Sequence, residues 1–227
     1  MEKLEFPGKC YFCNGTFSKA GMTKHLKSCI KRKILQYSPL ENKNINKTKL
    51  LHIVAEGKDY LPEYWLHLEA PAFATLEDLD ILLREIWLEC CGHASMFKID
   101  EERYFVEADE QWEQKSMDTE LGDVLTIRKW FYHDYDFGSP TYLMLRVVLE
   151  REGEIKDTSI KVLARNDPPL IKCQECDKLA VKFCTGCSGS EGGGWFCEDC
   201  AKKHKCEWGT FLPVVNSPRV GICGYSG

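Results

Sequence analysis

Residues 173–206 read CQECDKLAVKFCTGCSGSEGGGWFCEDCAKKHKC and hold seven cysteines and one histidine. So short a stretch cannot bury an apolar core of its own, and it needs another source of stability. Cysteine pairs separated by two residues are typical of structural zinc sites, which use four N or S ligands each. Eight candidate ligands therefore predict two closed zinc sites, formed by Cys173, Cys176, Cys184, Cys187, Cys197, Cys200, His204 and Cys206.

The sequence allows two ways of sharing these ligands. In sequential pairing the first four residues hold one ion and the last four hold the other. In the interleaved pairing, the first site is Cys173, Cys176, Cys197 and Cys200, and the second is Cys184, Cys187, His204 and Cys206. We favour interleaving, because the segment FCEDCAKKHKC places Cys200 at a helix start and His204 one turn later.

The interleaved arrangement resembles the MYND and B-box class of cross-braced modules. Only one residue separates His204 from Cys206, which is shorter than those families usually have. Cys223 therefore remains a rival for the last ligand position, in place of His204 or Cys206.

A second cluster lies at the N-terminus, with the spacing Cys10-x2-Cys13-x11-His25-x3-Cys29. Two cysteines on a turn, followed by a His and a Cys one helical turn apart, match a tetrahedral zinc site. Phe17 and Met22 are placed to form the small apolar core under the metal. The segment resembles the C2HC relatives of the C2H2 zinc fingers, and it raises the expected number of zinc ions to three.

The N-terminus MEKLEFPGKCYFC lacks the features of a signal peptide, and no run of eighteen apolar residues occurs. We therefore predict a cytoplasmic location, where reduced cysteines in close pairs are metal ligands more often than disulfides. The odd cysteine count, thirteen, agrees with this. Cys90 continues an apolar helical stripe and is predicted to be a core residue rather than half of a redox pair with Cys91. His52, His67 and His93 are expected to be structural.

Charge is unevenly distributed along the chain. Residues 1–50 hold eleven basic and three acidic side chains, whereas the rest of the chain holds 19 basic and 32 acidic ones. A polyanion would therefore bind the N-terminal part, and nucleic-acid contact is predicted for the finger helix, about residues 19–33. The residues are Lys19, Lys24, Lys27, Lys31, Arg32 and Lys33. In the alternative, these side chains only solvate a structural or protein-docking finger.

Between the clusters, residues 34–48 are expected to be a linker and residues 49–165 an α+β domain. The pattern predicts strands at LLHIVAEG, EYWLHLEA, HASMFKI, RYFVEA and SIKVLA, and an antiparallel hairpin from VLTIRKWFYHDYDF to TYLMLRVVLE. Thr75 and Asp78 form a capping box before an amphipathic helix that is expected to end at Gly92. This helix should cover one face of an antiparallel or mixed sheet. The full division is 1–33 finger, 34–48 linker, 49–165 central domain, 166–208 double-zinc module and 209–227 glycine-rich tail.

The central segment resembles the plasmid pRiA4b Orf3-like family, also described as TnpR-like passenger proteins of an insertion sequence. The matching features are Trp65, the Thr75-Leu76 helix start, His93, Phe97 and the run Tyr135-Asp136-Phe137-Gly138. The resemblance implies the α+β fold and an association with mobile elements or genome defence, with no established activity. The family pattern continues with Asp, Trp and His where this chain has Ser139, Thr141 and Leu143, which implies loss of any chemistry that used them.

The nearby His133, Asp134 and Asp136 do not share a strand face through adjacency, and we predict a partly exposed polar edge there. No phosphate loop, nucleophile elbow or catalytic zinc pattern occurs, so the sequence predicts no catalytic or cofactor-binding residues other than the zinc ligands. The function expected is a non-enzymatic zinc-binding adaptor. Its finger would touch nucleic acid and its C-terminal module, only mildly charged, would bind a protein. The alternatives are a purely protein-binding role and an enzyme with an unrecognised site in the central domain; neither a membrane nor a small-molecule substrate is expected as partner.

Overall fold

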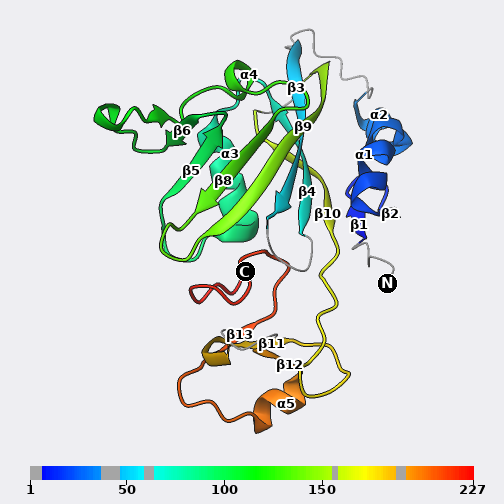
Figure 1. The fold of residues 1–227 in the computed structure, drawn as a ribbon. Helices are drawn as coiled ribbons and strands as arrows, with labels where there is room; N and C mark the ends of the chain where they lie inside the picture. The colour runs from blue at the N-terminus through cyan, green and yellow to red at the C-terminus, as the bar shows by residue number, and fades with distance from the viewer. Residues whose placement is uncertain (1–6, 37–46, 59–63, 155–157, 188–192) are drawn as a thin grey trace. The chain divides into compact units, whose positions relative to one another are not determined.

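The computed structural model describes residues 7–36, 47–58, 64–154, 158–187 and 193–227 (Figure 1). The chain forms two compact units. The first comprises Met1–Leu83 and Ala94–Asp167, and the second comprises Arg84–His93 and Pro168–Gly227. This division differs from the one expected from the sequence, because the finger belongs to the same unit as the central domain. The predicted linker lies mainly on residues outside the described ranges.

The first unit is built on a ten-stranded sheet, and its neighbouring strands pair antiparallel apart from β6 and β7, which pair parallel. The predicted α+β class with a mixed sheet is therefore confirmed. In spatial order the strands are β2 (Thr16–Phe17), β1 (Gly8–Cys10), β10 (Lys161–Asn166), β4 (Trp65–Pro71), β3 (Lys47–Gly57), β9 (Thr141–Glu154), β8 (Trp130–Tyr135), β5 (Ser95–Ile99), β6 (Glu102–Phe105) and β7 (Lys115–Ser116).

The strands follow from the period-two patterns of the sequence. Along β9, Leu143, Leu145 and Val147 are fully buried while the residues between them are only partly covered, as expected for a strand with one core face. β3 and β4 are buried on both faces over most of their length, consistent with their place in the middle of the sheet. The pairing of the predicted hairpin is confirmed as β8 and β9, from Trp130↔Arg146 to Tyr135↔Thr141. Its first strand begins at Trp130 rather than at Val124, because Val124 ends a short helix and Ile127 and Arg128 lie in a turn.

Helix α3 (Leu76–Leu83) lies against the sheet beside β8 (Figure 1). The capping box is present: the Thr75 N–H donates to Asp78 Oδ2 at 2.9 Å, and the Asp78 N–H donates to Thr75 Oγ1 at 3.1 Å. The helix continues as a π-helical turn, η1 (Arg84–Leu88), and so ends four residues before Gly92. Two short helices, η2 (Glu110–Trp112) and α4 (Leu121–Val124), lie between β6 and β8 in the chain.

The prediction of a partly exposed edge at His133 is wrong. His133 is fully buried on β8, and its Nε2 lies 2.6 Å from Oδ1 of the buried Asp80 on α3. The helix, not the neighbouring strand residues, supplies the partner, because α3 covers the sheet face to which His133 points. Asp136 is also buried, and its Oδ1 accepts the backbone N–H groups of Gly138 and Ser139 in the turn after β8.

The finger is part of the edge of this sheet. β1 pairs antiparallel with β10 from Gly8↔Asn166 to Cys10↔Ala164, and helices α1 (Lys19–Ser28) and α2 (Ile30–Gln36) follow β2. A Cβ on Gly8 would lie 2.3 Å from the Arg165 carbonyl oxygen and 2.5 Å from the Trp65 ring, so glycine permits this close approach. The finger is therefore fixed to the sheet by backbone pairing.

The second unit contains a three-stranded sheet, ordered β12 (Trp195–Phe196), β11 (Lys182–Cys184) and β13 (Phe211–Pro213). Its helices are η1, η3 (Thr185–Cys187) and α5 (Glu198–Lys203). Because β13 belongs to the sheet, the glycine-rich segment expected to be a separate tail from residue 209 contributes directly to the module. In the described parts of the chain, no helix is long and apolar enough to cross a membrane.

Candidate metal centres

Four Cys/His groups in the described residues bring four ligand atoms within 4.8 Å of one another. We refer to them as the finger site, the first C-terminal site, the second C-terminal site and the tail site. The finger site is Cys10, Cys13, His25 and Cys29; the first C-terminal site is Cys173, Cys176, Cys197 and Cys200; the second is Cys184, Cys187, His204 and Cys206; the tail site is Cys90, Cys91, His93 and Cys223. Three of these sets were predicted from the sequence, and the fourth was not.

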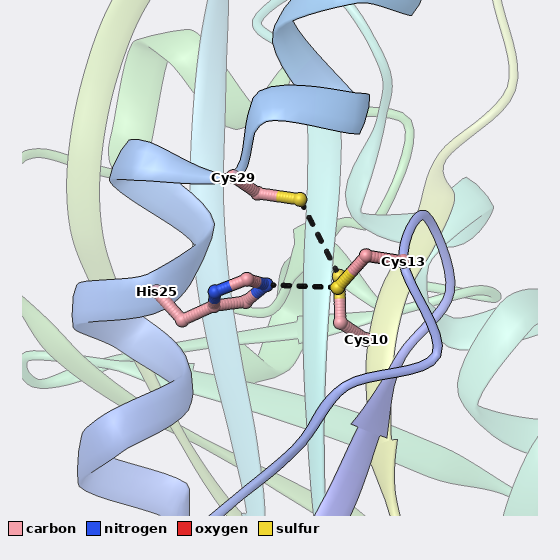
Figure 2. Close-up of side chains that lie close together, drawn as sticks. All are labelled: Cys10, Cys13, His25 and Cys29. Carbon is pink, nitrogen blue, oxygen red and sulfur yellow. Dashed lines mark hydrogen bonds between the residues drawn. The ribbon is translucent and has the colours of Figure 1, made fainter.

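The finger site is assembled by a tight turn and a helix (Figure 2). Cys10 ends β1 and Cys13 lies in the following turn, where Asn14 adopts a left-handed conformation with φ 58°. His25 lies on α1 and Cys29 directly after it. Cys13 Sγ lies 3.3 Å from His25 Nε2, and Cys10 Sγ lies 3.9 Å from Cys29 Sγ.

These separations match the edges of a zinc tetrahedron. Bond lengths of about 2.3 Å to sulfur and about 2.0–2.1 Å to nitrogen give S···S edges of about 3.8 Å and S···N edges of about 3.5 Å. In the first C-terminal site, Cys176 Sγ lies 3.7 Å from the sulfurs of both Cys197 and Cys200. In the second, Cys187 Sγ lies 3.4 Å from His204 Nε2. None of the thirteen cysteines forms a disulfide bond.

The interleaved pairing is confirmed. Cys173 and Cys176 share a site with Cys197, at the N-cap of α5, and Cys200, inside that helix. Helix α5 then ends at His204, which belongs to the other site, so one six-residue helix connects both centres. Cys206 completes the second C-terminal site, which rules out Cys223 as a replacement for it or for His204.

The protein around the ligands fits a metal. The Gly15 N–H donates to Cys13 Sγ at 3.4 Å and lowers the pKa of that thiol, and the backbone N–H of Cys200 lowers the pKa of Cys197. Such N–H···S bonds stabilise the thiolate form that zinc requires. Burial lowers the pKa of His25, which keeps the imidazole neutral and able to bind a metal.

Glycines make room for the sulfurs of the second C-terminal site. A Cβ on Gly209 would lie 2.5 Å from Cys184 Sγ and 2.9 Å from Cys206 Sγ, and a Cβ on Gly186 would lie 2.7 Å from Cys206 Sγ. The backbone thus closes around the ligands at a distance that only glycine allows. The donor sets and this packing fit zinc, which these residues would hold with four protein ligands at each site.

A shared apolar core supports the finger site. Met22 and Leu26 of α1 pack with Trp65, Leu163 and other buried residues of the sheet, and Phe17 packs against this cluster. The Phe17 ring also stacks on the imidazole of His25, with centroids 4.0 Å apart. Phe17 and Met22 therefore have the role predicted for them, but the sheet supplies much of the core that an isolated finger would have to supply itself.

Two of the six side chains predicted to contact nucleic acid are engaged inside the first unit. Arg32 is buried, and its guanidinium pairs with Glu69 on β4 and donates to the Leu26 carbonyl at 2.9 Å. Lys19 Nζ lies 3.0 Å from Glu56 Oε2 on β3. Arg32 is therefore unavailable to a phosphate. The exposed side chains of this set are Lys24, Lys27, Lys31 and Lys33.

The tail site corrects the expectation that Cys90 is a core residue. Cys90 is only partly buried, Cys91 is exposed, and both lie beside His93 and Cys223 rather than in an apolar core. The helical stripe that predicted a core role for Cys90 does not extend to it, since the helix ends at Leu88 after the π-helical turn. The short run Cys90-Cys91-x-His93 was the sequence signal for a metal site here. Its fourth ligand, Cys223, lies 130 residues after His93, so spacing alone could not find it.

Comparison with known proteins does not assign the chain to a family. No family model matches it, so the resemblance to the pRiA4b Orf3-like family is not confirmed, and no curated protein matches it. One similar solved structure is a protein of unknown function from Methanosarcina mazei Go1. It aligns with a TM-score of 0.45 and 18% identity over 52% of this chain and 68% of that one.

Proposed function

We propose that this protein is a non-enzymatic, zinc-stabilised adaptor whose C-terminal module binds a protein partner. Four protein ligands at each Cys/His site leave no open position of the kind that a catalytic zinc uses for water. The sites therefore favour a structural role for the metal, in which zinc replaces the core that the small C-terminal module lacks.

The observation that carries the proposal is the exposure of Trp208. Its side chain is 89% exposed, although tryptophan is an apolar residue that is usually largely covered. Trp208 lies between the ligand Cys206 and the tightly packed Gly209, and its backbone N–H lowers the pKa of Cys206. The side chain thus projects from a backbone that the metal site holds in place. Preorganised tryptophans of this kind are typical centres of protein–protein interfaces.

Other apolar side chains of the second unit are exposed as well: Leu170, Leu179, Val181 and Phe211. The Phe211 ring also packs against Phe196 and His204 at centroid distances of 5.8 Å, which couples its position to the second C-terminal site. The local charges are mixed, with Lys202, Lys203 and Lys205 near Glu198, Asp199 and Glu207 in sequence. These features favour a partner with an apolar docking segment over a polyanion.

The test compares two exposed tryptophans. The full chain is used to isolate partners from cells under reducing conditions, as wild type, Trp208→Ala and Trp112→Ala, where Trp112 is 76% exposed in the first unit. We expect the same captured protein with wild type and Trp112→Ala, and a loss of at least about tenfold with Trp208→Ala, at unchanged zinc content. Equal capture by all three proteins would refute docking at Trp208.

A second proposed role, contact with nucleic acid, is favoured by the four exposed finger lysines. Lys24 and Lys27 are three residues apart on α1, and Lys31 and Lys33 continue along α2. The start of α1 is less suited to reading bases, because Lys19 is paired with Glu56 of the sheet. We therefore propose phosphate contacts with little sequence preference.

Salt dependence of binding tests this role. Four phosphate contacts predict a slope of log K against log [salt] of about −3.6 on duplex DNA. Lys24→Glu with Lys27→Glu should reduce the slope by about half, whereas the charge-matched Lys202→Glu with Lys203→Glu should leave it unchanged. Binding that is undetectable at low salt, or equally affected by both double variants, would exclude the finger as a nucleic-acid surface and leave the protein-binding role.

A further inference from the structure

The tail site lies entirely within the second unit and joins two segments that are far apart in sequence. Cys90, Cys91 and His93 follow the π-helical turn η1, and Cys223 lies near the end of the described chain. The sulfur of Cys223 is 3.9 Å from Cys91 Sγ and 3.3 Å from His93 Nε2. These contacts bridge 132 and 130 residues of sequence.

We propose that Cys90, Cys91, His93 and Cys223 hold a fourth zinc ion, which fastens the C-terminal segment to residues 84–93. Two further separations lie within the site: Cys90 Sγ is 3.7 Å from Cys91 Sγ, and Cys91 Sγ is 3.0 Å from His93 Nε2. All four ligand atoms lie within 4.8 Å of one another. The sulfur edges are those of a zinc tetrahedron, with one S···N edge shorter than the ideal of about 3.5 Å. The S···S distances are far above the 2.05 Å or so of a disulfide bond.

The local backbone is shaped to bring the ligands together. Gly92 has φ +76°, which turns the chain between Cys91 and His93, and Cys223 itself adopts φ 49°. Left-handed conformations at non-glycine residues are uncommon and cluster at ligand-binding positions. The preceding π-helical turn is also a feature found frequently at functional sites.

Buried polar contacts hold the C-terminal segment in place around the site. Ser217 Oγ donates to the Trp87 carbonyl oxygen at 2.6 Å and accepts the Arg219 N–H at 2.8 Å. Arg219 is fully buried, and its Nη2 donates to Cys90 Sγ at 3.3 Å. This hydrogen bond orients the sulfur of Cys90, as hydrogen bonds from neighbouring residues commonly do for metal ligands. The site thus has an outer shell of its own.

The fourth site also accounts for every cysteine of the chain. The four groups contain all thirteen cysteines and three of the six histidines. Three of the sites use three cysteines and one histidine each, and the other uses four cysteines. This accounts for the odd number of cysteines without leaving any cysteine outside a site. The three remaining histidines, His52, His67 and His133, are buried in the first unit.

Exposure distinguishes the tail site from the other three. Each of the other sites includes at least one buried cysteine, whereas the tail-site ligands are exposed or only partly buried. A chelator therefore reaches this zinc most easily, and we expect it to be the first of the four ions released.

Metal analysis of the full chain, purified with a thiol reductant, tests the assignment. We expect about four zinc ions per wild-type chain and about three for Cys223→Ser, with Cys223→His, which supplies another zinc ligand, retaining about four. Ser226→Ala, an exposed change three residues away, is the matched control and should also retain four. Three ions in the wild type, or an unchanged count in Cys223→Ser, would overturn the proposal.

Thiol mapping provides a second readout that does not depend on the fold of a variant. Wild-type protein is treated with N-ethylmaleimide before and after a graded addition of EDTA, and modified peptides are located by mass spectrometry. Cys90, Cys91 and Cys223 should be protected at first and should then become reactive together, before the other ten cysteines. Immediate modification of these three thiols, or a Cys91–Cys223 disulfide in protein that holds three zinc ions, would contradict a metal at this site.

Discussion

Arg32 provides a direct test of whether the finger helices are anchored to the sheet or free to bind a polyanion. Its side chain is 4% exposed and pairs with Glu69, whose side chain is 13% exposed. Glu69 is also bonded to Arg151 through Nε at 3.1 Å and Nη2 at 2.8 Å. Arg32→Ala would therefore remove one partner of a largely buried carboxylate and leave the other.

The expected cost follows from these contacts. Breaking a buried ion pair typically costs about 3–5 kcal/mol, because it leaves an uncompensated charge. Arg151 still compensates Glu69 in part, whereas the 2.9 Å bond from Arg32 to the Leu26 carbonyl is lost as well. We expect Arg32→Ala to destabilise the protein by about 2–4 kcal/mol. For a chain of this size the melting temperature should fall by roughly 5–15 °C.

Thermal unfolding of zinc-saturated protein in a reducing buffer, followed by tryptophan fluorescence, measures the effect. Trp65 is a suitable reporter, because it is fully buried in the cluster shared by the finger and the sheet. The matched control is Lys31→Ala, an exposed neighbour whose loss should change stability by less than about 0.5 kcal/mol. If Arg32→Ala were no less stable than Lys31→Ala, the anchoring role of Arg32 would be wrong.

Three further predictions concern the metal sites and the buried histidines. Gly209→Ala should lose about one zinc ion per chain, because its Cβ would lie 2.5 Å from Cys184 Sγ. The control Gly138→Ala, whose Cβ would have its nearest contact at 3.5 Å, should lose none. Equal zinc contents of the two variants by metal analysis would contradict this packing. Burial lowers the pKa of His52 to about 2 and that of His67 to about 3, so protonation favours the unfolded chain, where the pKa is near 6.5. Stability should therefore fall as the pH drops below about 6.5, by about 1.5 kcal/mol between pH 7.5 and 6 for the two groups together. Urea titrations should show a weaker pH dependence in His52→Leu with His67→Leu, and an identical one would refute the assignment. Full chelation of zinc should remove amide-exchange protection from β11–β13 but leave β3 and β9 protected. The reason is that metal ligands lie at the ends of the three-stranded sheet, whereas β3 and β9 pair with each other and contain no metal ligand. Protection of β11–β13 after chelation would show that zinc is not needed there.

Features set by local spacing could be predicted from the sequence. A turn between two cysteines and a helix carrying the next two ligands fix a tetrahedron within about thirty residues, whatever surrounds it. For this reason Cys10 and Cys13 lie together with His25 and Cys29, and Cys173 and Cys176 lie together with Cys197 and Cys200. The strands of the central sheet were likewise visible as period-two patterns, and the capping box marked the start of α3.

Other outcomes depended on residues distant in sequence. The sequence predicted that Arg32 is an exposed cation of a basic helix. In the structure it pairs with Glu69, which lies 37 residues later in the chain. His133 was paired by Asp80 from a helix 53 residues earlier. Neither partner could be found from spacing, because helices and strands that meet in the fold place their side chains together without any periodic relation in the chain.

The tail site shows most clearly the difference between features set by local spacing and features set by distant contacts. By itself, the sequence determined the ligand set of the finger site, the eight candidate ligands of the C-terminal cluster, the α+β class and the basic character of the finger, and it favoured the interleaved pairing over the sequential one. Only the tertiary structure decided that Cys223 lies beside Cys91 and His93, and that Cys90 leaves the apolar stripe where the helix widens and ends. The physical reason is that a short loop restricts the geometry of its own ligands, whereas a contact across 130 residues exists only once the intervening chain has packed.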